Sequence, residues 1–316
     1  MTAGFFLGVD GGGTKTRFAL MDAGRKLVGE AQLGTSYYPD VGLDGVRDIL
    51  ATGVAKLLAD AGVDETQIAY AFFGLPAYGE DSKATPVLQS LPASILRHDR
   101  YACDNDMVCG WAGSLGAEDG INIVAGTGSI GYGQRASVSA RAGGWGEAFS
   151  DEGSAYWIAM QGLNAYSRMS DGRLPKGPLH TLINESLNLN NDLDLCAQVY
   201  GANARSRGEL AQFSPLIAKA AALEDEAAVN IFQRAGLELA QIAEALRQKL
   251  GYRPGEAVKL SYSGGAFSAG DVLLKPFQAA LTAASADFAL CRPLHEPHYG
   301  AALYAAKLWK GLPARL

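Results

Sequence analysis

Two short glycine-rich turns, each between two apolar strand-like runs, constrain this chain more than any other feature. The first lies in FFLGVDGGGTKTRFALMD (5–22), where three glycines follow an aspartate, and the second lies in GINIVAGTGSIGYGQ (120–134). Glycine lets the backbone approach a ligand closely, and successive N–H groups can form a nest for anionic oxygens. The pair predicts a duplicated architecture, with one strand–turn–strand unit in each of two lobes.

Two common phosphate-binding loops are excluded for the first turn. A dinucleotide fingerprint needs a third glycine, but position 16 is Thr, and a P-loop needs Gly-Lys, but Thr14 separates Gly13 from Lys15. Both loops also open a helix, whereas TRFALMD has the pattern of a strand. The remaining interpretation is a β-hairpin whose tip binds phosphates, and a tight turn without any ligand is the alternative.

The two hairpins are expected to hold a triphosphate from both sides. The expected nucleotide-binding residues are Gly11, Gly12, Gly13, Thr14, Lys15, Thr16, Gly126, Thr127, Gly128 and Ser129. Asp10 ends the first strand, where a carboxylate can hold Mg²⁺ through water because that ion keeps much of its hydration shell.

Length and composition indicate a two-domain protein with a small-molecule ligand. The chain has 316 residues, 48% of them hydrophobic, and its net charge of −6 argues against nucleic-acid binding. We find no signal peptide and no apolar run of about 20 residues. The four cysteines form no C-x-x-C pair, so we expect reduced thiols and a cytoplasmic protein.

The order of predicted elements indicates an α/β chain. A β-meander opens the sequence, a helix follows over 44–61, IAYAFFGLP is a buried strand, and a further strand leads into a helix beginning near Asp106. The second half is mostly helical, with a late strand in AVKLSYSGGAF and a final helix in HYGAALYAAKLWKG.

The DGGGTKT turn, the AGTGS turn and above all GGWGEAFSDEGSAYWIA (143–159) resemble the N-acetylglucosamine kinase group of the BadF/BadG-type ATPases. This resemblance covers essentially the whole chain and places it among the actin-like sugar kinases. It implies two ribonuclease-H-like lobes with a central nucleotide cleft, ATP and Mg²⁺ as cofactors, and an amino sugar as substrate. We expect an N-terminal lobe over 1–118 and a C-terminal lobe over 119–316, with a last helix (about 297–311) packing back on the first lobe.

The same resemblance implies roles for particular residues. The family's base is an Asp at a strand end about 20 residues before the GTGS glycine, which favours Asp106 and leaves Asp104 as the alternative. Either acid could instead cap the helix. Gly264 and Gly265 resemble the adenosine-binding turn.

The sugar pocket is expected around the GGWG and DEGS motifs. Asp151 would contact sugar hydroxyls, and the alternative is that it caps the next helix. Gly144, Trp145 and Gly146 would line the sugar pocket, with the Trp145 ring packing against the sugar, and the alternative is that Trp145 is a core residue. Related kinases carry an Asn after the first hairpin, whereas GTSYYPDVG has none, so a hydroxyl such as that of Ser36 is expected in its place. This departure leaves the identity of the amino sugar open.

The sequence therefore predicts a cytoplasmic ATP- and Mg²⁺-dependent kinase that acts on the 6-hydroxyl of N-acetylglucosamine or glucosamine. We expect it to form a homodimer and to bind neither a membrane nor a nucleic acid. An ATPase that activates a partner enzyme is the main alternative, but the cysteines do not resemble iron–sulfur ligands. A sugar-sensing repressor is a third, for which we expect no DNA-binding segment because the first strand begins near residue 4. His295 and His298 are expected to be a surface pair rather than a metal site, and Cys103 and Cys109 small buried residues.

Overall fold

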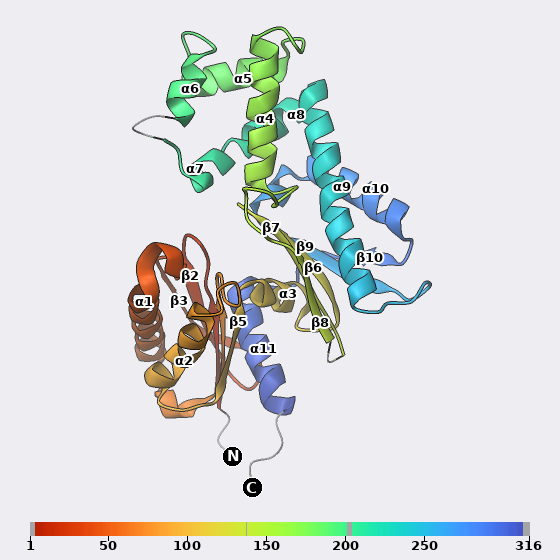
Figure 1. Cartoon of the computed structure of the whole chain (residues 1–316). Coiled ribbons are helices and arrows are strands. Elements are labelled where there is room, and N and C mark those ends of the chain that lie inside the picture. Colours follow the sequence, from red (N-terminus) through yellow and green to blue (C-terminus); the bar gives the residue numbers. More distant parts are fainter. Residues whose placement is uncertain (1–3, 137, 201–203, 312–316) are drawn as a thin grey trace. The chain divides into compact units, whose positions relative to one another are not determined.

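The computed structural model describes residues 4–136, 138–200 and 204–311, and these residues form two compact units (Figure 1). The first unit runs to Asp119 and includes the chain again from Arg292 onward, while the second spans Gly120–Cys291. The C-terminal helix thus belongs to the first unit, although it follows the second in the sequence.

The first unit is built on a five-stranded mixed sheet in the order β3-β2-β1-β4-β5. Its strands are β1 (Phe5–Asp10), β2 (Thr16–Met21), β3 (Leu27–Leu33), β4 (Ile68–Leu75) and β5 (Tyr101–Asn105). The first three strands form the predicted antiparallel meander, and β4 and β5 run parallel to β1.

The second unit repeats this topology, since its sheet has the order β10-β9-β6-β7-β8. Its strands are β6 (Gly120–Ala125), β7 (Ser129–Arg135), β8 (Val138–Gly143), β9 (Val258–Ser263) and β10 (Phe288–Leu290). Here too the first three strands are antiparallel and the last two run parallel to the first. The predicted duplication and α/β class are therefore confirmed.

Helices cover both faces of the first sheet. They are α1 (Tyr38–Ala61), α2 (Ala84–Leu96), α3 (Met107–Leu115) and α11 (Pro297–Gly311), with a short 3₁₀ turn η1 (Glu65–Gln67) before β4. Apolar residues of α1 and α2 pack on one face around Leu7 and Phe18. On the other face α11 lies against β1 and α3, so closely that a Cβ at Gly300 would lie 2.7 Å from the Cys109 carbonyl oxygen.

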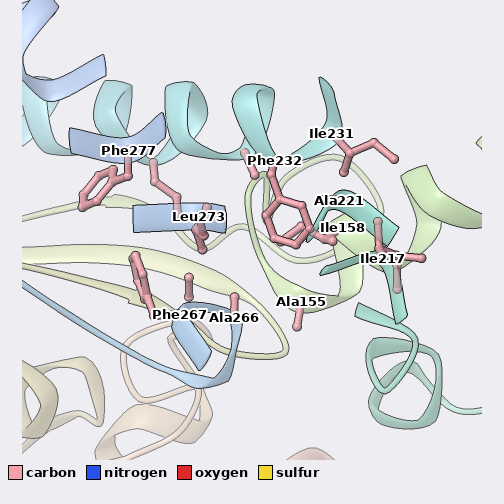
Figure 2. Close-up of a cluster of buried hydrophobic side chains, with 14 of the residues drawn as sticks. Ala155, Ile158, Ile217, Ala221, Ile231, Phe232, Ala266, Phe267, Leu273 and Phe277 are labelled. Carbon is pink, nitrogen blue, oxygen red and sulfur yellow. The ribbon is translucent and has the colours of Figure 1, made fainter. Parts of the chain in front are cut away.

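The second unit carries a larger helical layer. Its helices are α4 (Ala155–Ser170), α5 (Pro178–Leu187), α6 (Asp194–Val199), α7 (Arg207–Ala211), α8 (Ser214–Ala222), α9 (Glu226–Lys249) and α10 (Asp271–Ala284), with the 3₁₀ turn η2 (Gly265–Ala269). Figure 2 shows part of the buried core that joins them, with Phe232 of α9 and Phe277 of α10 among its largest members. Burial of such side chains contributes about 1.5–3 kcal/mol each.

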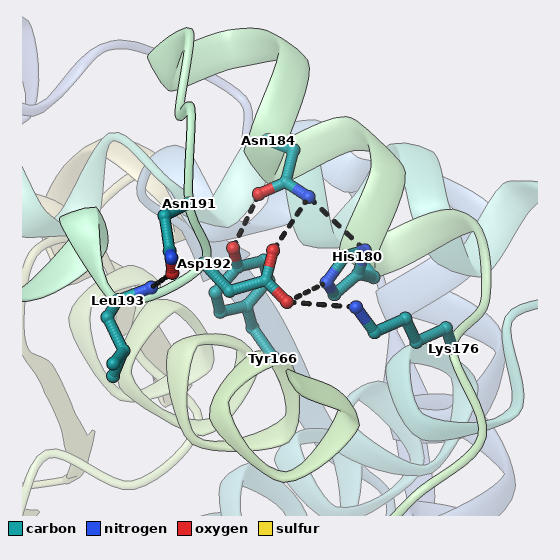
Figure 3. A network of polar contacts seen from close by, with 7 residues as sticks. All are labelled: Tyr166, Lys176, His180, Asn184, Asn191, Asp192 and Leu193. Carbon is teal, nitrogen blue, oxygen red and sulfur yellow. Dashed lines mark hydrogen bonds and ion pairs between the residues drawn. The ribbon is translucent and has the colours of Figure 1, made fainter. Parts of the chain in front are cut away.

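A polar network stabilises the segment between α5 and α6 (Figure 3). Asp192 accepts hydrogen bonds from His180 at 2.8 Å and Lys176 at 2.9 Å, while the Tyr166 hydroxyl donates to Asn184 at 2.5 Å. These bonds hold the pKa of Asp192 well below its usual range, and burial, followed by the charge of Asp192, raises the pKa of Tyr166 to about 12. The network thereby ties α4 to α5 and to the loop before α6.

One expectation from the sequence needs correction. The pair His295 and His298 is not a surface pair, because His298 is only 2% exposed and contacts Glu30 on β3. Pro297 between them occupies the first position of α11, where the missing N–H of proline costs nothing. Within the described part of the chain, none of the helices has the length and apolar character of a membrane span.

Candidate active site

The sequence-predicted residues of the first unit gather where its parallel strands end. Asp10 ends β1, and Asp106 directly follows β5, with β4 between these two strands. The carboxyl ends of parallel strands meet at one edge of a sheet, which is where ligands bind in open α/β folds. The structure therefore brings Asp10 and Asp106 to the same edge.

Gly74 on β4 permits this approach. It pairs in register with Asp10 on one side and with Asp104 on the other. A Cβ at Gly74 would overlap the Cys109 sulfur and lie 3.2 Å from the Cα of Asp106. The absence of a side chain at this position thus lets the start of α3 pack over β4, beside Asp10.

The electrostatics of this edge are unfavourable for two free carboxylates. Burial, and then the charge of Asp106, raise the pKa of Asp10 to about 8, while Arg17 opposes the shift. Like-charged carboxyls that share a buried site resist simultaneous ionisation. The carboxyl groups of Asp10 and Asp106 can therefore bind a cation or accept the proton of a bound hydroxyl.

Hydrogen bonds hold the first turn in place from beneath. The Gly11 N–H donates to the Gly74 carbonyl at 2.8 Å, and the Thr35 hydroxyl donates to the Gly12 carbonyl at 2.8 Å. Ser36 is 1% exposed, and its buried hydroxyl has no hydrogen-bond partner in the structure. A Cβ at Gly11 would overlap this hydroxyl, so Ser36 lies directly against the turn.

The alternative that the acids cap α3 can be examined directly. Asp106 occupies the capping position but makes no side-chain capping bond, and the Asn105 side chain instead accepts from the Met107 N–H at 3.2 Å. Asp104 accepts from the Asn105 N–H at 2.7 Å, and burial raises the pKa of its carboxyl. Neither acid therefore caps this helix through its side chain.

The second unit gathers its own set of predicted residues at the corresponding sheet edge. The turn at 126–129 follows β6, and Gly264 follows its parallel neighbour β9. A Cβ at Gly264 would lie 2.5 Å from the Ala125 carbonyl carbon and 2.7 Å from the Gly126 nitrogen. Only glycine allows these two backbone segments to touch, and Gly264 has a φ of +100° that also favours glycine.

Asp151 belongs to this second cluster and does not cap α4. The cap is Ser154, whose hydroxyl accepts from the Trp157 N–H at 3.1 Å. The Asp151 carboxyl accepts from the Ser129 N–H at 3.3 Å and forms an ion pair with Arg207 of α7. The capping interpretation of Asp151 is therefore wrong.

The GGWG segment lies at the surface of the second unit. Trp145 is 72% exposed, so it is not a core residue, and Phe149 nearby is 76% exposed. Gly144 and Gly146 both have positive φ values, +71° and +95°, which glycine adopts without strain. The Trp145 indole is thus exposed on a backbone whose conformation requires glycine-like freedom on both sides of it.

A cavity of about 480 Å³ lies away from both clusters, near the N-terminal ends of α5 and α9. Its lining includes Arg168, Lys176 and Arg234, and it contains none of the sequence-predicted site residues. We therefore place the candidate active site at the sheet edges and not in this cavity.

Three side chains of the two clusters were not predicted as site residues. Thr35 precedes Ser36, and Asn105 lies between Asp104 and Asp106, so their position in the sequence could have identified them as members of the site. Arg207 lies 56 positions from Asp151, in a helix that the motifs do not reach. No local sequence pattern connects it to the site.

The fold has counterparts among solved structures. A candidate N-acetylglucosamine kinase from Chromobacterium violaceum superposes with a TM-score of 0.72 at 22% identity, covering 96% of this chain and 99% of that one. A ROK-family glucokinase from Streptomyces griseus, in complex with glucose and AMPPNP, superposes with a TM-score of 0.56 at 16% identity, covering 96% of this chain and all of that one. These likenesses show that the chain shares the overall α/β fold of those two structures.

The chain belongs to the BadF/BadG/BcrA/BcrD ATPase family, whose model matches residues 7–305. It is 29% identical over 274 residues to an N-acetyl-D-glucosamine kinase from Dictyostelium discoideum, covering 84% of this chain and 86% of that protein. It is 26% identical over 262 residues to an N-acetylmuramic acid/N-acetylglucosamine kinase from Clostridium acetobutylicum, covering 83% of this chain and 85% of that protein. Membership of this family implies ATP as a ligand.

The first turn offers a matched pair of variants. A Cβ at Gly11 would overlap packed atoms, whereas a Cβ at Gly13 meets no atom within 4 Å. We expect Gly11→Ala to lower the free energy of unfolding by about 1–3 kcal/mol. Gly13→Ala should leave unfolding nearly unchanged, and if the tip of this turn binds the phosphates of ATP, the added methyl group should weaken ATP binding about tenfold.

Denaturant titration and calorimetric ATP binding would measure both quantities on each variant. Gly11→Ala serves as the control for general damage to the turn. Unchanged ATP affinity in Gly13→Ala would exclude the tip of this turn from phosphate binding.

Proposed function

We propose that this protein is an ATP-dependent kinase that phosphorylates an amino sugar, N-acetylglucosamine or glucosamine, at its 6-hydroxyl. The observation that carries the proposal is the approach of Asp106 to Asp10 at the edge of the first sheet. Transfer of a phosphoryl group to a hydroxyl needs a proton acceptor beside a site for charge neutralisation. The names of the relatives support the same substrate class.

In this proposal both glycine-rich turns bind the nucleotide. Backbone N–H groups at the tips of the two turns, within residues 12–15 and 127–128, would bind phosphate oxygens, because the N–H groups of Gly11, Gly126 and Ser129 already donate within the protein. The exposed Lys15 would neutralise charge. Gly264 and Gly265 would allow the adenosine to lie flat against the backbone. The contact of Gly264 with the 126–129 turn supports this assignment.

Mg²⁺ is the expected metal, and the residues present fit it. In the described part of the chain no three His, Cys, Asp or Glu side chains form a complete metal cage. Mg²⁺ usually binds one or two carboxylates together with waters and substrate phosphates, so Asp10 alone can supply the protein ligand. The ion would offset the negative charge of the phosphates, and Asp10 would hold it at the end of β1.

Asp106 would accept the proton of the sugar hydroxyl, with Asp104 as the alternative base. Asp106 lies over Gly74 beside Asp10, whereas Asp104 pairs with Gly74 within the sheet and accepts its neighbour's N–H. Asp106 thus has the better access to a group bound at the strand ends.

Three side chains are proposed to contact the sugar. Asp151 would accept hydrogen bonds from sugar hydroxyls, and the Ser36 hydroxyl is a buried polar group without a partner in the structure. The exposed Trp145, between Gly144 and Gly146, would pack against the apolar face of the sugar ring. The proposal also includes a cytoplasmic location and a homodimer.

An assay of ADP release with N-acetylglucosamine, glucosamine, glucose and no sugar tests the proposed function. We expect turnover only with a sugar, and highest with one of the two amino sugars. Release of ADP at the same rate without any sugar would contradict the proposal and support an ATPase that activates a partner enzyme.

The two candidate bases can be separated by substitution. Asp106→Asn should lower kcat by about 10²–10⁴ while ATP affinity changes little, because only the proton acceptor is lost. Asp104→Asn is the matched control and should retain most of the activity. The reverse pattern in steady-state kinetics would assign the base to Asp104.

A further inference from the structure

Arg207 is the charged side chain that the site motifs did not include. It begins α7, and its guanidinium pairs with Asp151 and lies 3.3 Å from the Glu147 carboxylate. A Cβ at Gly128 would lie 2.6 Å from Nη2 of Arg207 and 2.9 Å from Oδ2 of Asp151. The ion pair therefore sits directly against the second glycine-rich turn.

We propose that Arg207 is a positioning residue, which keeps the Asp151 carboxyl ionised and oriented to accept hydrogen bonds from the sugar. The inference rests on the proposed function, because it assigns Asp151 to the sugar site. It concerns a residue that acts through another and does not itself require contact with the substrate.

Burial creates the need for such a partner. The Asp151 side chain is only 4% exposed, whereas that of Arg207 is 36% exposed. A buried carboxylate is strongly disfavoured unless it is paired and hydrogen-bonded. Arg207 lies on the more exposed side of this pair and supplies the compensating charge.

The charges around Asp151 act in opposite directions. Burial is the largest influence and raises the pKa of Asp151, Arg207 from α7 lowers it, and Glu147 and Glu152 from the adjoining loop raise it further. The Ser129 N–H at the start of β7 favours the ionised form. Without Arg207, burial and the charges of the two glutamates would raise the pKa of Asp151, and only the Ser129 N–H would oppose them.

The ionised carboxyl keeps acceptor capacity for the sugar. A carboxylate offers about four lone-pair directions, and the Ser129 N–H and Arg207 use two of them. A protonated Asp151 would lose part of this capacity and present a donor instead. Sugar hydroxyls that donate to Asp151 would then bind more weakly.

The backbone supports this orientation. Asp151 has a φ of +64°, in the left-handed region that Asp and Asn tolerate better than most residues. Strained positions of this kind cluster at functional sites. Asp151→Asn therefore removes the charge without a new backbone penalty.

The helix that presents Arg207 is well anchored. Ser206 and Glu209 form a capping box at its start, with the Ser206 N–H donating to Glu209 at 2.7 Å. Leu210 and Ala211 are buried in the core of the second unit. The guanidinium is thus held by packed secondary structure.

The test is the affinity for N-acetylglucosamine, measured by calorimetry from pH 5 to 9. In Arg207→Gln the affinity should fall about tenfold or more at pH 6 and return to within a few-fold of wild type at pH 9, because Asp151 ionises only at higher pH. Arg207→Lys, which keeps the charge, should stay close to wild type. Arg205→Gln, on the same segment, is the matched control and should be unchanged.

Two results in this assay would overturn the inference. An equal loss of affinity at every pH would show that Arg207 binds the sugar directly or supports the structure. A gain in affinity would show that Arg207 competes with the sugar for Asp151. Should Arg207→Gln fail to fold, Arg207→Met is the second neutral variant for the same measurement.

A readout that needs no sugar separates failure of this inference from failure of the proposed function. The carboxyl ¹³C resonance that Asp151→Asn removes reports the titration of Asp151 in the free protein. Its midpoint should rise by about one to three pH units in Arg207→Gln. An unchanged midpoint would refute the role of Arg207 even if the wild type binds no sugar.

Discussion

The approach of two carboxyl groups at one sheet edge is the constraint on which the account of this site depends. Asp10 and Asp106 come from strands that are separated by β4, and Gly74 on β4 has no side chain to keep α3 away. Both carboxyl groups are partly buried, and burial together with the charge of Asp106 raises the pKa of Asp10 to about 8. Two neighbouring carboxyls favour a bound cation, which removes their mutual repulsion and leaves one of them ionised as a proton acceptor. Charge neutralisation and a proton acceptor are what phosphoryl transfer to a hydroxyl requires.

The repeated topology explains why the second unit has a cluster of the same kind. In both units a glycine-rich turn follows the first strand of the sheet. The parallel strand beside that first strand contains or precedes a glycine, Gly74 in the first unit and Gly264 in the second, against which another segment of the chain packs closely. The two clusters nevertheless differ in charge. The first contains neighbouring carboxyls, whereas the second pairs its buried carboxyl with an arginine. The duplicated scaffold thus carries two clusters of different charge.

Much of this architecture was predictable because the relevant signals are local. The two glycine turns, the opening meander and the helix after Asp106 follow from residues that are neighbours in the sequence. The role of Gly74 was not predictable, because it depends on the order of strands in the sheet. Arg207 and the contact between His298 and Glu30 were missed for the same reason, since each joins segments far apart in the chain. Local sequence patterns therefore locate the turns and the acidic residues. The residues that influence the ionisation of these acids are brought to them by the tertiary structure.

A crystal structure of the protein with ADP and Mg²⁺ would locate the bound nucleotide. We expect the metal beside Asp10 and the diphosphate within hydrogen-bonding distance of backbone N–H groups in residues 11–16 and 126–129. Diphosphate bound elsewhere, for example in the cavity near Arg168 and Arg234, would contradict this expectation.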